Sequence, residues 1–396
     1  MVVQHLPKTC LLALAMLAGA PSTTQDIVAP VAISEAPAAA APHWSKPDLA
    51  QLLAAVEAAR DEGLRPSDYR RDEIAAAVAA DQGGPAVDAL AQGAARALAH
   101  DYADGRIGDR ARFDWHIDHS PAALTTLDVD LDRAVADDKL DAYLGGLLPQ
   151  DARYAALRDA LHATPAKETA RIAHIRASME RWRWMPRTLG DDYLMVNVPA
   201  YRVTFYRDNA AVVTNDVVVG ARKTPTPMIS AYVGSIVVNP WWTLPPLVLA
   251  EGRRYARARG YVTTIVDGRA MVRQKPGPLN ALGRIKIDMP NPYAIYLHDT
   301  PAKAAFAKAD RALSHGCIRV KDIAALAGRL DETATLDGAL AGPMTQTRTL
   351  QLQRSVPVYI VYFTAAQDDA GKVVTLADPY ARDAGLVAAL DAVPRA

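Results

Sequence analysis

Residues 312–320 read ALSHGCIRV and place Cys317 between a glycine and an arginine, two positions after a histidine. The 396-residue chain has only one other cysteine, Cys10, which lies in an apolar N-terminal segment. A cysteine becomes a nucleophile when a neighbouring group accepts its proton or lowers its pKa and when donors hold the oxyanion that forms beside it. The alternative role is that of a small buried hydrophobe. The neighbours of Cys317 favour the nucleophile.

Two histidines are candidate bases for Cys317. In an extended chain the side chains alternate, so His315 can share a face with Cys317, whereas His298 has to come from another strand. The sequence leaves the choice between them open. Asp299 follows His298 directly, and adjacent residues on a strand point to opposite faces, so we interpret Asp299 as structural rather than as the third member of a triad.

Two further residues fit the same chemistry. Gly316 permits a backbone geometry that directs successive N–H groups to one point, and Arg319 is a cation that can bind a carboxylate through two hydrogen bonds. A structural ion pair is the alternative role for Arg319. A thiol, a histidine base, backbone donors and a carboxylate-binding cation together indicate an acyl-transfer site.

The N-terminus predicts export. Lys8 precedes an apolar run over residues 11–18, and small residues follow at 18–20, which is typical of a secretory signal peptide spanning residues 1–20. The run is shorter than the roughly 20 residues of a membrane-spanning helix, so we expect cleavage and a periplasmic protein, with an uncleaved inner-membrane anchor as the alternative. Cys317 would then be the single thiol of the mature chain.

The balance of charged residues bears on the classes of partner to expect. The 44 basic and 44 acidic residues give a formal net charge of zero, which provides no reason to expect nucleic acid as a partner. The Ala/Pro-rich residues 21–43 predict a linker.

The first half of the remaining chain has a helical pattern. After Ser45 and Pro47, apolar residues recur at helical spacing, and similar Ala/Leu-rich segments occupy 72–81, 85–102, 131–146 and 151–162. We predict an all-α module over residues 44–174. A connecting helix over 175–190 contains alternating Arg and Trp, which we interpret as docking its tryptophans on a neighbouring domain rather than as a ligand-binding face.

The second half has a β pattern, and we predict a β-rich domain over residues 191–390. Segments with period-2 alternation occur at 193–198, 201–206, 211–219, 234–239, 294–299 and 356–363, and we expect a helical or irregular interlude at about 247–290. The predicted fold class is therefore α+β and multidomain, with a helical module followed by a β-rich domain.

A family resemblance rests on this part of the chain. His298, followed after fifteen residues by Ser314-His315-Gly316-Cys317, resembles the signature of the L,D-transpeptidases with a YkuD-type catalytic domain. The stretches VVNPWWTLPP (237–246), RQKPGPLNALGRIKI (273–287) and PNPYAIYLHDTPAK (290–303) are similar to the YcbB-like branch, as is ERWRWMP (180–186). Only about a dozen residues lie where this branch commonly carries a peptidoglycan-binding domain, so such a domain is missing.

The resemblance implies a role for each matching residue. Cys317 would attack a peptidoglycan stem peptide, His298 would carry the proton, and the backbone N–H groups of His315, Gly316 and Cys317 would hold the oxyanion. Tyr296, Ser314 and Arg319 would assist as oxyanion or substrate-binding residues. Residues 247–286 would form a capping segment over the site, and Arg273, Gln274 and Lys275 would line this lid. Stem peptides and carbapenem-type inhibitors are the implied ligands, with no cofactor, no metal, and a monomer or transient partners in cell-wall synthesis.

Three alternatives remain. The same Cys/His site would give an L,D-carboxypeptidase or endopeptidase if water resolved the thioester. A metal site could use His298, His315, Cys317 and Asp299, although the usual paired spacing of ligands is missing. An exported scaffold with an inactive motif is the third alternative.

Overall fold

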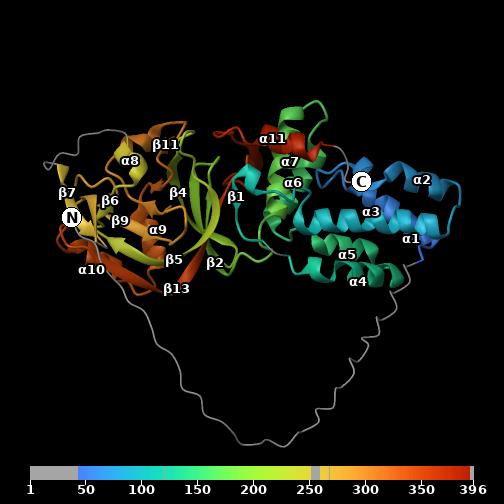
Figure 1. The fold of residues 1–396 in the computed structure, drawn as a ribbon, viewed down its shortest axis with the longest axis horizontal. Coiled ribbons are helices and arrows are strands. Elements are labelled where there is room, and N and C mark those ends of the chain that lie inside the picture. Colours follow the sequence, from blue (N-terminus) through green and yellow to red (C-terminus); the bar gives the residue numbers. More distant parts are fainter. Residues whose placement is uncertain (1–42, 120, 251–258, 267, 393–396) are drawn as a thin grey trace, which may run out of the picture. The chain divides into compact units, whose positions relative to one another are not determined.

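The computed structural model describes residues 43–119, 121–250, 259–266 and 268–392 (Figure 1). The predicted signal peptide and all of the predicted linker except His43 lie outside these ranges.

The first part of the described chain is helical, as predicted. α1 begins with a capping box, in which the Ser45 side chain accepts from the Asp48 N–H and the Asp48 side chain accepts from the Ser45 N–H. Its apolar stripe, Leu49, Leu52 and Val56, is buried. The helical elements are α1 (Lys46–Ala58), η1 (Pro66–Tyr69), α2 (Arg71–Ala79), α3 (Pro85–Asp104), η2 (Ala111–Phe113), α4 (Ala123–Ala136), α5 (Leu140–Leu147), α6 (Ala152–Ala163) and α7 (Thr169–Arg183).

One predicted helix is divided. Residues 131–146 form one segment of the helical pattern in the sequence, but in the structure α4 ends at Ala136 and α5 begins at Leu140. Asp138 between them has φ of 56°, a left-handed conformation that short acidic side chains tolerate better than most. The chain therefore turns at this point.

The tryptophans of the RWRW motif are buried against aromatic rings, which confirms docking. Trp182 stacks on Phe363 at 4.9 Å between ring centroids, and Trp184 meets Trp115 edge to face at 5.4 Å. At Gly105, where φ is 81°, a Cβ atom would lie 2.7 Å from the Trp184 indole nitrogen. The close approach of α3 to α7 thus requires glycine at this position.

An ion pair at the end of α7 is fully buried. Arg183 donates to Glu180 Oε2 at 2.8 Å and also to the Tyr154 hydroxyl and the Glu62 carbonyl, and both charged side chains have zero exposure. Glu180 Oε1 accepts from the Ile107 N–H. Every arm of the pair is therefore hydrogen-bonded, which offsets the cost of burying the two charges.

Replacing Glu180 by glutamine should destabilise the protein by about 3–5 kcal/mol, because it leaves the Arg183 guanidinium buried without a counter-charge. Denaturant unfolding of the purified protein checks this. Asp391→Asn is a matched control, since Asp391 pairs with Arg176 while 41% of its side chain is exposed; we expect a cost below about 1 kcal/mol. Equal costs for both variants would contradict the role given to Glu180.

The β-rich part contains a large sheet that closes on itself. Its strand order is β1-β5-β13-β2-β3-β4-β12-β10-β9, and β9 also pairs with β5. Figure 1 shows β2, β4, β5 and β13 in this part of the chain. The strands are β1 (Trp115–His116), β2 (Asp192–Asn197), β3 (Arg202–Arg207), β4 (Ala210–Gly220), β5 (Met228–Val238), β9 (Ile285–Asp288), β10 (Leu297–His298), β11 (Ala312–Ser314), which pairs with β4, β12 (Ile318–Val320) and β13 (Arg348–Val361).

One strand of this sheet comes from the helical part. β1 pairs in parallel with β5, with Trp115 opposite Met228 and His116 opposite Ile229. The buried ion pair of Arg181 with Asp383 at 2.6 Å adds a second link, between α7 and α11 (Asp383–Leu390), which lie beside each other in Figure 1. The helical and β-rich parts therefore share buried contacts.

The interlude at 247–290 differs from the expectation of helical or irregular structure. A three-stranded antiparallel sheet forms with the order β6-β8-β7, from β6 (Trp242–Thr243), β7 (Tyr261–Val266) and β8 (Arg269–Gln274). In the chain, α8 (Pro246–Ala250) lies between β6 and β7. Gly268, with φ of 74°, lies in the turn between β7 and β8. A short hairpin turn of this kind brings two β segments together.

The predicted strand at 294–299 is shorter than expected, and only Leu297 and His298 are in it. The Asn291 side chain accepts from the Tyr293 and Ile295 N–H groups and donates to the Ile295 carbonyl, and Ala294 has φ of 53°. This side-chain-stabilised turn replaces the first half of the predicted strand. It brings the Ala294 carbonyl to the cysteine.

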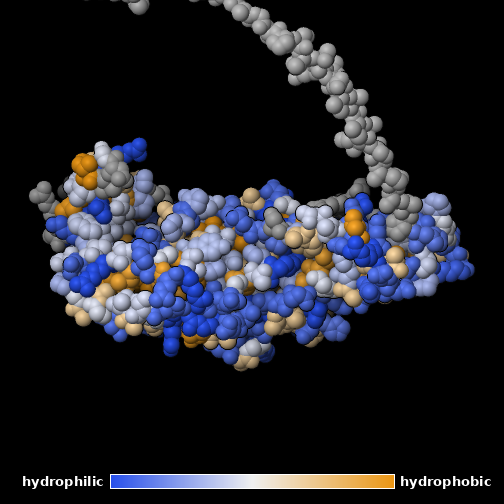
Figure 2. Space-filling view, turned by 90° about the horizontal axis from the view of Figure 1, so that it is seen from below, coloured by the Kyte–Doolittle hydropathy of each residue, from blue (hydrophilic) through white to orange (hydrophobic). Residues whose placement is uncertain are grey.

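The remaining elements are η4 (Lys303–Ala307), α9 (Ile323–Leu330), α10 (Leu336–Ala341), β14 (Ala365–Gln367) and β15 (Val373–Thr375). Figure 2 shows one face of the molecule, on which hydrophilic residues predominate and apolar residues form small scattered groups. Among the helices of the described ranges, none is both long enough and apolar enough to cross a membrane.

Candidate active site

Two neighbouring strands bring the signature residues together. β10 and β12 are parallel, with Leu297 opposite Ile318 and His298 opposite Arg319. Leu297 and Ile318 are fully buried and point to the interior of the closed sheet. Because side chains alternate along a strand, His298 and Arg319 lie on the other face, and Cys317, two residues before Arg319, lies there too.

The turn before β12 holds Cys317 in place. The Ser314 hydroxyl donates to the Cys317 carbonyl at 2.6 Å and accepts from the Gly316 N–H at 3.1 Å. The Gly316 carbonyl accepts from the Thr226 hydroxyl at 2.7 Å. Gly316 has φ of 113°, a conformation that L side chains rarely adopt. Ser314 therefore positions the nucleophile, and glycine is required beside it.

This geometry corrects one expectation about the oxyanion. The N–H of Gly316 was expected to help hold it, but that N–H donates to Ser314 within the turn. It is therefore not directed at a substrate in this conformation.

The thiol of Cys317 is half-buried and faces the turn at 291–296. Its Sγ is 3.6 Å from the Ala294 carbonyl, and both the backbone N–H and the hydroxyl of Tyr296 are within hydrogen-bonding reach. Burial raises the pKa of the thiol, and the Tyr296 donors and the charges of Lys286 and Arg319 oppose this shift without cancelling it. At neutral pH the resting group is the thiol.

His298 is 5% exposed, and its tautomer is fixed. Nδ1 lies 2.5 Å from the Asp299 carbonyl, and because a carbonyl can only accept, Nδ1 carries the proton and Nε2 is the free acceptor. Burial, assisted by the charges of Arg319 and Lys286, lowers the pKa of His298 to about 3 despite the Asp299 carbonyl, which opposes the shift. The imidazole is therefore neutral and ready to accept a proton.

The Asp299 carboxylate is used elsewhere. It accepts from the Arg284 N–H at 2.9 Å and pairs with Lys303 at 2.5 Å. The imidazole is thus oriented by the main-chain carbonyl of Asp299, and the carboxylate has the structural role that the sequence indicated.

Tyr296 links the nucleophile to β6, the strand that pairs with β8 of the predicted cap. Its ring centroid lies 5.6 Å from that of His298, and its hydroxyl is within hydrogen-bonding reach of both Cys317 and the Trp242 indole. Burial raises the pKa of Tyr296 well above its usual value. The phenol is therefore neutral and can act as a donor beside the sulfur.

His315 lies in the turn between β11 and β12 and is exposed, whereas His298 is enclosed. Of the two candidate bases, only His298 has a cross-strand register that places it on the face of Cys317. Arg319 is half-buried, and burial lowers its pKa from the usual value.

The three residues expected to line the cap have different environments. Arg273 stacks over the Trp241 ring at 4.7 Å, and Lys275 is exposed. Gln274 is buried, donates to the carbonyls of Arg259 and Leu279, and accepts from the Ala281 N–H. Its amide therefore holds the segment together and is not available to a ligand.

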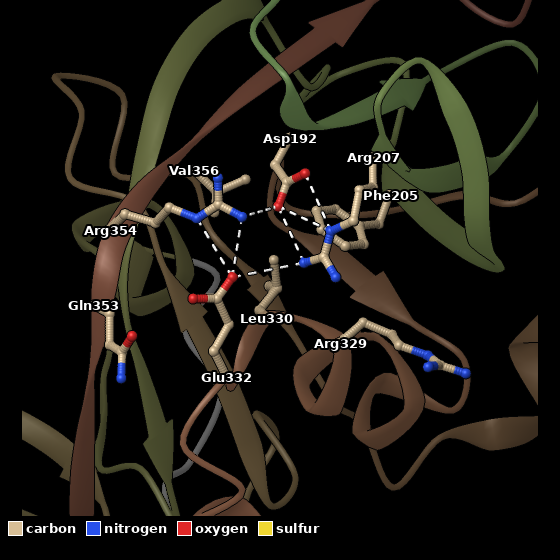
Figure 3. A pocket seen from close by; sticks show the side chains of 9 residues that line it. All are labelled: Asp192, Phe205, Arg207, Arg329, Leu330, Glu332, Gln353, Arg354 and Val356. Carbon is tan, nitrogen blue, oxygen red and sulfur yellow. Dashed lines mark hydrogen bonds and ion pairs between the residues drawn. The ribbon is translucent and has the colours of Figure 1, made fainter.

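A pocket between β2, β3, β13 and α9 is closed by its own charges (Figure 3). Its volume is about 10 Å³. Arg207 pairs with Asp192 at 3.1 Å, and Arg354 pairs with Glu332 at 3.0 Å and also with Asp192. This cluster ties strands together and leaves no room for a substrate. A larger groove of about 950 Å³ lies between α6 and the faces of β2–β4, away from Cys317.

Carbamidomethylation of Cys317 by iodoacetamide should accelerate about tenfold per pH unit from pH 6 to 8, with no plateau. The rate should rise with pH because burial raises the pKa of the thiol, and below that pKa the thiolate fraction rises tenfold with each pH unit. Mass spectrometry of the peptide that contains Cys317 measures the rate. A plateau below pH 7 would instead indicate a thiolate–imidazolium pair.

Among the residues that the structure describes, no group of three or more His, Cys, Asp or Glu side chains could hold a metal ion. This finding offers no support for the metal-site alternative.

Comparison with known proteins identifies the two parts of the chain. Residues 191–360 match the model of the L,D-transpeptidase catalytic domain (YkuD), and residues 37–161 match that of a scaffold domain. A Haemophilus influenzae protein provisionally named an L,D-transpeptidase is 30% identical over 218 residues, which are 48% of this chain and 44% of that protein. The chain thus spans less than half the length of this relative.

Solved structures of L,D-transpeptidases are also similar. The catalytic domain from E. faecium, acylated by ertapenem, is 16% identical over 44% of this chain and 99% of that chain, with a TM-score of 0.25. The enzyme from Mycobacterium smegmatis is 12% identical over 43% and 58%, with a TM-score of 0.26. Scores this low do not establish a shared fold. From the family models, the chain carries an L,D-transpeptidase catalytic domain of the YkuD type, with a scaffold domain N-terminal to it.

Proposed function

We propose that this protein is an exported peptidoglycan L,D-transpeptidase that forms 3→3 crosslinks through a thioester on Cys317. The observation that carries the proposal is a thiol and a neutral imidazole on one face of two adjacent strands, with Nε2 of His298 unprotonated. This is the arrangement in which a histidine accepts the proton of a cysteine nucleophile during attack.

The reaction has two half-reactions. Cys317 Sγ attacks the carbonyl of the third residue of a stem tetrapeptide while His298 Nε2 takes the thiol proton. The amide bond to the terminal D-alanine then breaks, and His298 returns the proton to the departing amine. In the second half-reaction the side-chain amine of another stem attacks the thioester, its proton passes through His298 to the sulfur, and the thiol is restored. No ATP is needed, because the thioester retains the reactivity of the broken amide.

Hydrogen-bond donors next to Cys317 Sγ would stabilise the oxyanion. The Tyr296 hydroxyl is neutral and close to the sulfur, so we assign it this role together with the backbone N–H of Cys317. Trp242 of β6, which is within hydrogen-bonding reach of Tyr296, pairs with Gln274 of the cap segment, and that segment would exclude water and favour the amine over hydrolysis.

Analysis of the products formed from purified tetrapeptide monomers tests the proposal. Crosslinked dimers together with free D-alanine are expected from the wild type, and neither from a sample whose Cys317 has been alkylated. Shortened monomers alone would instead assign an L,D-carboxypeptidase, and unchanged substrate would favour a non-catalytic scaffold. We further propose that carbapenems acylate Cys317, which intact-protein mass spectrometry would detect.

We place the protein in the periplasm on the strength of the leader at residues 1–20. N-terminal sequencing of protein recovered from the periplasmic fraction tests this. A start near residue 21 is expected, whereas recovery in the membrane with an intact leader would indicate an anchor.

A further inference from the structure

An ion pair, Lys286 with Asp288, lies on the same sheet face as the nucleophile. β9 is antiparallel to β10, with His298 opposite Lys286 and Leu297 opposite Ile287. Cross-strand partners share a face, so Lys286 is the immediate neighbour of the imidazole. Asp288 pairs with Lys286 at 2.7 Å, and the Lys286 ammonium lies 4.5 Å from the Tyr296 ring centroid.

This pair is accessible to a ligand. The Lys286 and Asp288 side chains are 23% and 34% exposed, whereas His298 is almost fully buried. An ammonium has three donors, and Asp288 occupies one side of it. Lys286 can therefore bind an anion from solvent while Asp288 holds it in position.

The order in which Cys317, His298 and Lys286 lie across the sheet matches the order of the atoms that each would contact in the reaction intermediate. Across the sheet, Cys317 directly precedes β12, β10 carries His298 and β9 carries Lys286. Across the tetrahedral intermediate of either half-reaction, the sulfur holds the former carbonyl carbon. The amine nitrogen is bonded to the same carbon and exchanges its proton with the imidazole, and the carbon bearing the carboxylate follows. An α-carboxylate attached to that amine thus extends toward Lys286.

The same group occurs in both half-reactions. The leaving D-alanine bears an amine and a carboxylate on one carbon of D configuration. Where the third residue of the acceptor stem is a diamino acid whose side-chain amine and a carboxylate share one carbon, the attacking end bears the same group. One carboxylate-binding cation on the far side of the imidazole from the sulfur would serve both steps.

We propose that Lys286, held by Asp288, binds the α-carboxylate of the D-amino acid that leaves in the first half-reaction and of the amine that enters in the second. This inference rests on the proposed function. Within the same site, it makes Lys286 the residue that selects amine acceptors with an α-carboxylate. Arg319, two residues after Cys317 in β12, is on the donor side of the imidazole.

Competition between two small acceptors tests the assignment. A tetrapeptide donor is incubated with equal concentrations of deuterated D-alanine and D-alaninamide, which differ in the carboxylate, and the two exchange products are counted by mass spectrometry. Because both acceptors compete for one acyl-enzyme, the product ratio is independent of how fast Cys317 is acylated.

In Lys286→Met the ratio of acid to amide product should fall about tenfold or more relative to the wild type, the effect of losing one charged hydrogen bond. Lys286→Arg should restore most of the ratio, which a purely structural role would not explain. If Lys286→Met yields no product, Lys286→Gln is measured in its place with the same expectation.

Two outcomes would overturn the assignment alone: exchange with an unchanged ratio in the Lys286 variants, or a fall seen in Arg319→Met instead. Failure of the wild type to exchange D-alanine at all would overturn the proposed function, and this inference with it.

Discussion

Replacing Cys317 by serine is expected to lower D-alanine release by roughly a thousandfold or more, the scale on which loss of a nucleophile acts in acyl-transfer enzymes. The alcohol of serine ionises far less readily than a thiol. His298 would therefore have to remove a much less acidic proton at the same position. Release of D-alanine from tetrapeptide substrate measures the loss.

The fold should not change in this variant. The Ser314 hydroxyl bonds the main chain of residues 316 and 317, and neither bond involves the thiol. The denaturant midpoint of Cys317→Ser should therefore equal that of the wild type. Retention of a tenth or more of the wild-type turnover would show that the sulfur is not the nucleophile.

Part of this site could be predicted from the sequence because it follows from short-range rules. The types of the residues around Cys317 are enough to predict an acyl-transfer site. The alternation of side chains along a strand also predicts that His298 comes from another strand. The parallel register of His298 with Arg319 depends on which strands pair. Strand pairing is a long-range property that periodicity does not encode.

The occupied N–H of Gly316 was unpredictable for a similar reason. The motif shows that a serine precedes the glycine, but only the folded turn shows its hydroxyl accepting that N–H. The position of Lys286 and Asp288 beside the site could not be predicted either. Their alternation within IKID (285–288) predicts a shared face, but nothing local indicates that this face includes His298.

The missed hairpin, in contrast, had a local signal. The segments YVTTIV (261–266) and RAMVRQ (269–274) flank the dipeptide Asp-Gly, the usual mark of a two-residue hairpin turn. The helices were predicted more completely because capping and apolar spacing, as in α1, are local signals.

Replacing His298 by asparagine is expected to slow acylation of Cys317 by a carbapenem about 10²–10⁴-fold at pH 7, the usual contribution of a general base. The asparagine amide can take the place of Nδ1 and keep the bond to the Asp299 carbonyl, so the loss reports the missing Nε2 acceptor. The rate of the mass shift of the intact protein measures it. His315→Asn tests the other candidate base, and we expect the larger loss at 298.

The pH dependence separates a base from a merely structural residue. The burial-raised pKa of Cys317 means that a base is needed below that pKa and is dispensable above it, where the thiolate forms unaided. The defect of His298→Asn should therefore shrink as the pH rises through that pKa, while a defect from a damaged fold would persist at every pH. A larger loss in His315→Asn, or a constant ratio of variant to wild type from pH 7 to 10, would remove His298 from the role of base.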